Sequence, residues 1–230
     1  MGTITRCVAV ALAALVFSGG GIVKAQTPQR EPIEWSNFWW ENTNDKKLPR
    51  VLLIGDSISV GYSNFVKDRL KGKANVDRLS TSKAIDDPAL LKETEYAIEG
   101  YKHAVIHFNN GLHGWHVTEK DYEKCLQAYV KKLRELAPDA RLIWAGTTPY
   151  PSSKPGVTLD KEKNAVVLAR NAIAEKVMKE NNIPINDLYT LMVGDLDHLT
   201  ASKGNVHYNE KGRTMQGEAV AKEILKAIKE

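Results

Sequence analysis

Short apolar runs alternate with longer amphipathic stretches along most of the chain, and this alternation restricts the fold more than any other feature. Candidate strands lie at residues 51–54, 76–79, 104–108, 142–145 and 183–185. The first of them, residues 51–54, is a short continuous apolar run, which is typical of a strand that is buried on both faces. The stretches through 65–70, 87–98, 119–136, 161–181 and 210–230 have helical spacing, and Asn209 can cap the last of them. Strands that alternate with helices predict a parallel sheet covered by helices on both faces.

The composition fits one globular unit. Hydrophobic residues make up 43% and charged residues 26% of the 230 residues, which excludes a disordered chain, a collagen-like repeat and a disulfide scaffold. The formal charge of +4 gives no reason to expect nucleic acid as a partner. Residues 49–230 contain no repeat or linker, so we expect one α/β domain there, preceded by an aromatic-rich extension at 26–48, and a monomer.

The first 25 residues have the pattern of a secretory signal. Arg6 precedes an apolar run from Cys7 to Phe17, and small residues follow up to Ala25. The run is about half of the roughly 20 residues that a membrane span needs, which favours cleavage after Ala25 over a membrane anchor. We therefore expect a secreted or periplasmic protein with no membrane attachment after cleavage. Its remaining cysteine, Cys125, lies on the apolar face of a predicted helix, which indicates a core residue and not a nucleophile.

Polar segments follow two of the predicted strands, at the edge where ligands bind in open parallel sheets. Gly55-Asp56-Ser57 comes directly after the first strand. A serine in such a tight turn presents its hydroxyl above the sheet, beside the N–H groups of the following helix. The usual second glycine is missing, so a plain helix cap is the alternative. In the loop 108–116, Asn110 or His113 is a candidate hydrogen-bond donor to an oxyanion.

A third polar segment, residues 205–212, lies just before the last predicted helix. It contains His207, and a histidine fixed at a helix entrance can act as the general base for Ser57. A surface histidine is the ordinary alternative. A metal site is not expected, because the histidines at 103, 107, 113 and 116 have no cysteine pair and no His-Glu-x-x-His spacing.

Together these segments resemble the conserved blocks of the GDSL, or SGNH, hydrolase family over residues 49–230. Gly55-Asp56-Ser57 matches the first block, with Ser57 as nucleophile. Val206-His207-Tyr208-Asn209, with Gly212, is similar to the last block, with His207 as base. The resemblance implies a three-layer α/β/α sandwich around a mainly parallel five-stranded sheet, of the flavodoxin-like SGNH type. It also implies ester hydrolysis without a cofactor.

The chain departs from this family in the two blocks that supply the oxyanion hole. The loop 80–83 has no glycine, so we expect backbone N–H groups of Ser80 or Ser82 to serve together with that of Ser57. The third block reads Gly111-Leu112-His113-Gly114, which leaves His113 or Asn110 as the side-chain donor.

The last block also departs from the family, because Gly204 stands where an aspartate usually precedes the histidine. The group that orients His207 therefore stays open among Asn205, Asp195, Asp197 and a backbone carbonyl. A neutral group would hold the tautomer but would stabilise the imidazolium less than a carboxylate. A separate Asp-x-x-His at 195–198 lacks the glycine and helix that follow His207.

These residues predict a two-step esterase in which His207 activates Ser57 and an acyl-enzyme forms. Export and the family resemblance favour an O-acyl ester, most simply O-acetyl, on a small or polymeric carbohydrate. Tryptophans are candidates for stacking on sugar rings, or for packing within the domain: Trp35, Trp39, Trp40 and Trp115. The alternatives are a lipase or thioesterase acting on lipid or aryl esters, and a non-catalytic carbohydrate-binding relative.

Overall fold

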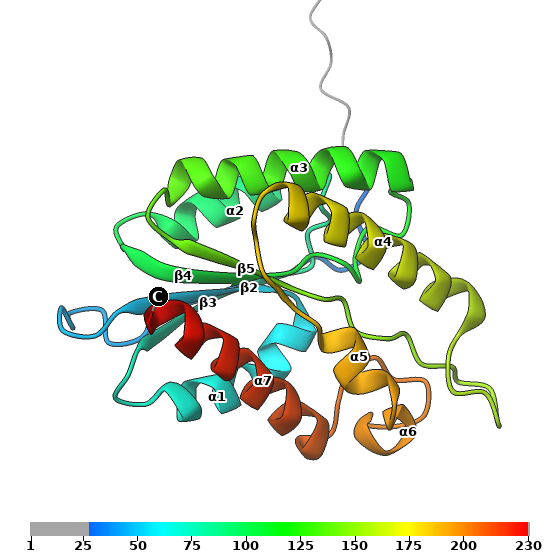
Figure 1. Cartoon of the computed structure of the whole chain (residues 1–230). Coiled ribbons are helices and arrows are strands. Elements are labelled where there is room, and N and C mark those ends of the chain that lie inside the picture. Colours follow the sequence, from blue (N-terminus) through cyan, green and yellow to red (C-terminus); the bar gives the residue numbers. More distant parts are fainter. Residues whose placement is uncertain (1–27, 230) are drawn as a thin grey trace, which may run out of the picture.

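The computed structural model describes residues 28–229 (Figure 1). The predicted signal segment 1–25 and its cleavage site after Ala25 lie outside the described residues.

Within the described residues the centre of the fold is a six-stranded sheet in the order β1-β3-β2-β4-β5-β6. Its strands are β1 (Ser36–Trp39), β2 (Arg50–Gly55), β3 (Asn75–Thr81), β4 (His103–Phe108), β5 (Arg141–Ala145) and β6 (Ile185–Asn186). Neighbours from β3 to β6 are paired in parallel, and β1 runs antiparallel to β3. Every residue of β2 is buried, as its continuous apolar run predicts.

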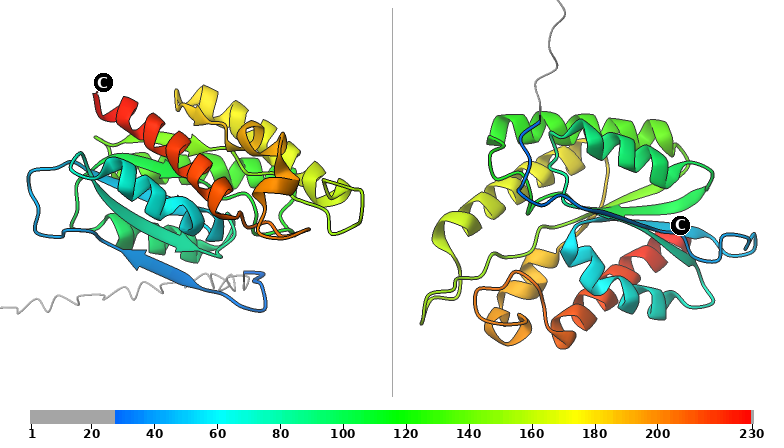
Figure 2. Two further views of the ribbon diagram at one scale, coloured as in Figure 1. Left: turned by 90° about the horizontal axis from the view of Figure 1, so that it is seen from below. Right: turned by 180° about the vertical axis from the view of Figure 1, so that it is seen from behind.

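Helices cover both faces of the sheet, which gives the expected three layers (Figures 1 and 2). One face is packed by α1 (Ser57–Leu70) and α7 (Glu210–Lys229), with the short α5 (Leu188–Val193) and α6 (Leu196–Leu199) beside α7. The other face is packed by α2 (Pro88–Ile98), α3 (Glu119–Leu136) and α4 (Lys161–Glu180). Alternate residues of β2 enter the two cores, since Val51 and Leu53 face α1 while Leu52 and Ile54 face α2 and α3.

Polar side chains fix the starts of α1 and α7. Asp56 accepts a hydrogen bond from the Ile58 N–H (2.8 Å) at the start of α1. Asn209 accepts one from the Gly212 N–H (3.0 Å), so it caps α7 as predicted. α1 and α7 lie close together because Gly217 has no side chain: a Cβ there would lie 2.4 Å from the Cβ of Phe65.

The prediction of a five-stranded sheet is wrong by one strand, and the extra strand comes from the extension at 26–48. β1 pairs with β3 from Ser36 opposite Thr81 to Trp39 opposite Arg78. The same segment also packs against α2. The indole N–H of Trp40, the residue after β1, donates to the Ala97 carbonyl at the end of α2 (3.2 Å). A domain boundary at residue 49 therefore separates a strand from the sheet to which it belongs. The fifth predicted strand lies slightly later, at Ile185–Asn186, and α5 and α6 follow it.

Candidate active site

Ser57 is the first residue of α1 and lies at the carboxyl end of the central strand β2. The turn between them needs glycine at position 55, because a Cβ there would lie 2.8 Å from the Cβ of Ser59. The Asp56 cap then holds the first turn of α1 in place. As a result the Ser57 hydroxyl lies at the edge where ligands bind in this type of sheet.

His207 lies next to Ser57 in the fold, although 150 positions separate them in the sequence. The distance from His207 Nε2 to Ser57 Oγ is 2.9 Å. The histidine lies in the turn before α7, where its backbone carbonyl accepts a hydrogen bond from the Ala201 N–H (2.8 Å). The two side chains that the sequence singles out as nucleophile and base are therefore within hydrogen-bond reach.

Asn205 orients the imidazole of His207. Its Oδ1 lies 2.9 Å from both the backbone N and the Nδ1 of His207. The backbone N–H can only donate, so the atom that faces it is the amide oxygen and not the amide nitrogen. The same oxygen then accepts from Nδ1–H, which leaves the lone pair of Nε2 directed at Ser57.

The other candidates for this orienting role have different partners. Asp195 lies 2.6 Å from His198 Nδ1 and 3.2 Å from Lys211 Nζ. Asp197 accepts from Thr158 (3.2 Å) and pairs with Lys203. The backbone at Gly204 has φ +74°, and a Cβ there would lie 2.7 Å from the Cα of Ser153. An aspartate at position 204 does not fit in this conformation, which explains why the neighbouring Asn205 takes the role.

We predict that Asn205→Asp changes the pH dependence of the reaction. A carboxylate accepts the same two hydrogen bonds and adds a negative charge beside the imidazolium that forms during catalysis. The acid limb of the kcat/KM profile is expected to move to higher pH, and kcat on the plateau to rise by about tenfold. The measurement is a pH–rate profile with an aryl acetate.

Asn205→Leu is the matched variant, since it removes the acceptor and keeps a similar volume. It is expected to lower kcat by about 10²- to 10⁴-fold, because the tautomer is no longer fixed. An Asn205→Leu protein with the wild-type rate and profile contradicts the assigned role.

Ser80 and Ser82 take part in backbone pairing with neighbouring segments, so the interpretation of their N–H groups as oxyanion donors is wrong. The Ser82 N–H donates to the carbonyl of Trp35 (3.1 Å), and the Ser82 hydroxyl accepts from the Trp35 N–H (2.9 Å). Ser80 lies within β3, between its pairing partners Gly55 and Asn37. Both side chains are buried. Pairing with the unpredicted β1 segment is the physical reason for the difference.

The side-chain candidates for the oxyanion hole are also engaged. Asn110 is buried, and its amide group donates to the Lys83 carbonyl (2.8 Å). His113 Nδ1 lies 2.8 Å from a carboxylate oxygen of Glu31, which leaves Nε2 for a further partner. The Ser57 N–H lies at the N-terminus of α1, where N–H groups point out of the helix.

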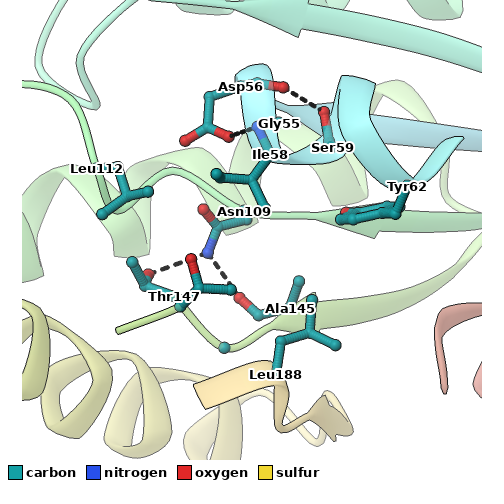
Figure 3. A pocket seen from close by; sticks show the side chains of 12 residues that line it. Gly55, Asp56, Ile58, Ser59, Tyr62, Asn109, Leu112, Ala145, Thr147 and Leu188 are labelled. Carbon is teal, nitrogen blue, oxygen red and sulfur yellow. Dashed lines mark hydrogen bonds between the residues drawn. The ribbon is translucent and has the colours of Figure 1, made fainter. Parts of the chain in front are cut away.

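Two residues that sequence reasoning missed hold the loop after β4. Asn109 donates to the Ala145 carbonyl (2.6 Å) and the Thr147 hydroxyl (3.1 Å), at the wall of a small cavity below the nucleophile turn (Figure 3). Arg170, buried in α4, donates to the carbonyls of Gly111, His113 and Gly114 at 2.6 to 3.0 Å. The sequence signal for the role of Arg170 is the presence of an arginine on the apolar face of the predicted helix 161–181.

Residues 30–36 cross the loops that follow β3 and β4, and we call this segment the strap. Its contacts are ionic and backbone hydrogen bonds: Arg30 with Asp87 (2.6 and 3.2 Å), Glu31 with His113 (2.8 Å), Glu34 with Lys83 (2.6 Å) and Trp35 with Ser82. The carboxylate of Glu34 also accepts from the Ser82 hydroxyl (3.0 Å). The strap thus ties together two loops beside Ser57 that sequence reasoning assigned to the oxyanion hole.

Ser57 lies in an open groove. Its walls come from the strap, the first turns of α1 and α7, and the turn that holds His207: Trp35, Ser57, Ile58, Val60, Gly61, Ala201, His207, Tyr208, Asn209, Glu210, Arg213 and Gln216. The lining combines an aromatic ring, aliphatic side chains and both signs of charge. Such a groove suits a ligand with apolar and polar faces.

The histidines outside the groove are bound by separate partners. His103 is 2.9 Å from Asp77, and His116 is 3.0 Å from Asp86. His107 is buried in β4, and burial lowers its pKa to about 4, so it is neutral at pH 7. Among residues 28–229 no three acidic, histidine or cysteine side chains gather as a metal site. In the same range no helix combines the length and apolarity of a membrane span.

Comparison with known proteins gives a family and a fold. The model of the GDSL-like lipase/acylhydrolase family matches residues 53–214. Solved structures with the same fold include an acetyl xylan esterase, AlAXEase (18% identity, TM-score 0.63, covering 76% of this chain and 99% of that one). A GDSL-like lipase from Bacteroides thetaiotaomicron (18%, 0.60, 80% and 91%) and an acetylxylan esterase from Geobacillus stearothermophilus (15%, 0.61, 76% and 94%) are further examples. No curated protein matches the sequence.

Proposed function

The chain belongs to the GDSL-like lipase/acylhydrolase family and is a hydrolase of ester bonds, and from this we propose that it is a serine esterase that removes O-acyl groups, most simply O-acetyl, from carbohydrate. The observation that supports a serine mechanism is the hydrogen-bonded series Ser57–His207–Asn205, with 2.9 Å at each contact. This series has the geometry of a nucleophile, a base and an orienting group.

The proposed reaction proceeds in two steps. His207 Nε2 takes the Ser57 proton as Oγ attacks the acyl carbon, and the Ser57 N–H at the start of α1 stabilises the oxyanion. The alcohol leaves with the proton from the imidazolium, and the acyl group stays on Ser57. A water molecule, deprotonated by His207, then attacks the acyl-enzyme and releases the acid. Asn205 holds the imidazole through both steps without adding charge.

Two features support a short acyl group on a sugar. The groove at Ser57 is open and lined by Trp35, Glu210 and Arg213, which suits a hydroxyl-rich alcohol better than a long alkyl chain. Two structures that share the fold are described as acetyl xylan esterases. We also propose that the protein acts as a monomer outside the cytoplasm, without membrane attachment or a cofactor. The signal-like pattern of residues 1–25 supports export.

Acetate release tests this proposal. The protein is expected to release acetate from acetylated xylan or a related acetylated polysaccharide, and to act poorly on p-nitrophenyl palmitate. A clear preference for the long-chain ester overturns the proposal in favour of a lipase. Labelling by a serine-directed fluorophosphonate that depends on Ser57 distinguishes the enzyme from a non-catalytic carbohydrate-binding relative.

A further inference from the structure

One side of α1 forms a stripe that begins at the nucleophile itself. Ser57, Val60, Asn64 and Lys67 follow each other at three- and four-residue intervals, so they share one face of the helix. Ten residues of α-helix extend for about 15 Å. Val60 is 37% exposed, and Asn64 is exposed as well. The stripe therefore leads away from the active site along the surface of α1.

The edge strand faces this stripe with a row of its own. Trp39 lies opposite Arg78 in the antiparallel pair, and Asn37 lies opposite Ser80, which bonds to Ser59 of α1. Asn37 and Trp39 therefore point to the α1 side of the sheet, and Trp35 follows the same alternation. The intervening Phe38 packs instead on Tyr96 of α2. Four residues of strand separate Trp35 from Trp39 by about 13 Å.

These two rows line a surface that adjoins the groove at Ser57. Val60 lines both the groove that contains Ser57 and His207 and a second hollow beside Trp39. The second hollow is completed by Ser63, Asn64, Lys67, Val76 and Arg78. β1 lies at the edge of the sheet (Figure 2). We call the whole surface, from Ser57 to Trp39, the trough.

The two basic side chains of the second hollow have partners within the protein. Lys67 forms an ion pair with Glu41 (2.6 Å). Arg78 donates to two neutral acceptors, the Ser63 hydroxyl (2.7 Å) and the Asn37 side-chain oxygen (2.8 Å). Hydroxyl and amide oxygens are thus the acceptors that this arginine already binds, which suits a neutral, hydroxyl-rich occupant. An alkyl chain would cover Asn37 and Asn64 without replacing their hydrogen bonds to water.

We propose that the trough binds a linear oligosaccharide chain, with Trp39 as a stacking surface distant from the ester. This inference rests on the proposed carbohydrate esterase function and adds to it that the substrate is a chain of several sugars. Sugar rings have apolar faces for the indole of Trp39, which is 54% exposed, and hydroxyl edges for Asn37 and Asn64. The distance of about 13 Å between Trp35 and Trp39 is longer than one sugar ring, so only a chain of several sugars can contact both.

The test is the dependence of kcat/KM on chain length. The probes are acetylated xylo- and cello-oligosaccharides of one to six sugars, with p-nitrophenyl acetate as a reference ester. For wild type, kcat/KM is expected to rise about tenfold from one sugar to four and then to level off. Trp39→Ala is expected to remove most of that rise, so the ratio of tetrasaccharide to monosaccharide falls close to one.

Tyr96→Ala is the matched control, because Tyr96 is 56% exposed on the opposite side of β1. It is expected to keep the full chain-length ratio. A tetrasaccharide-to-monosaccharide ratio near one in wild type, or an unchanged ratio in Trp39→Ala, refutes the proposal that the trough binds a sugar chain. Either result leaves the esterase proposal in place. Hydrolysis of p-nitrophenyl acetate without hydrolysis of any acetylated sugar overturns the proposed carbohydrate substrate instead. An increase of rate with acyl length, and not with sugar length, assigns the trough to a lipid chain.

Discussion

Ser57→Ala is expected to lower kcat for an aryl acetate by about 10⁴- to 10⁶-fold, because the acyl-enzyme can no longer form. His207→Ala is expected to cost about as much. The double variant is expected to be no slower than either single one, because two groups 2.9 Å apart act as a unit in the same step. The measurement is steady-state kinetics of the three variants, with thermal melting to confirm that each one folds.

The serine at position 202 provides the control for this series. Ser202 is exposed in the turn before His207, and Ser202→Ala keeps the backbone carbonyl that accepts from the Asn205 N–H (3.1 Å). This variant is expected to retain wild-type kinetics. A folded Ser57→Ala protein with the wild-type rate would refute the assigned nucleophile.

A chain that starts at residue 49 is expected to lose activity at least a hundredfold and to melt more than about 10 °C lower than a chain that starts at residue 28. Without the strap, the loops after β3 and β4 lose their ionic partners Arg30, Glu31 and Glu34. Without β1, the edge of β3 is open to pairing with another chain. The comparison needs kinetics and melting curves of the two chains.

The chain that starts at residue 49 is also expected to lose stability near the amino ends of β2, β3 and β4, where Arg50, Asp77 and His103 lie. The Asp77 carboxylate is buried, and it accepts from Arg50 (2.6 and 2.8 Å), His103 (2.9 Å) and the Glu41 N–H (2.9 Å). Burial favours its neutral form, but these hydrogen bonds outweigh burial and hold the pKa of Asp77 below its usual value. The shorter chain lacks Glu41. Full activity and an unchanged melting temperature in that chain would show that the extension is dispensable.

The buried part of the fold follows from the sequence, whereas its edge does not. β2 contains a continuous apolar run because both of its faces are covered, and this makes it recognisable. β1 has only four residues, with three of them exposed, and its one tryptophan, Trp39, fits surface stacking equally well. Its pairing with β3 depends on contacts across about forty residues of chain, which no local pattern records.

The same distinction holds for the site. Ser57 and His207 are recognisable because each lies where a local turn or cap positions a side chain. The role of Asn205 depends on the left-handed backbone at Gly204, and a spacing rule based on the usual aspartate does not contain that information. Arg170 and the strap act through contacts between distant segments. Sequence reasoning therefore singled out the two side chains that the fold brings within hydrogen-bond distance, Ser57 and His207, and missed the residues that hold their surroundings.

The packing of α7 on α1 affects when Ser57 and His207 can come together during folding. Ser57 is synthesised 150 residues before His207, and the close packing of α7 on α1 at Gly217 and Phe65 holds them together in the folded protein. Contacts of such sequence separation form late and slowly in folding. We therefore expect partly folded chains, including those still being synthesised, to have Ser57 without His207 beside it. Hydrolysis that needs both side chains is then expected only of molecules that have completed their fold.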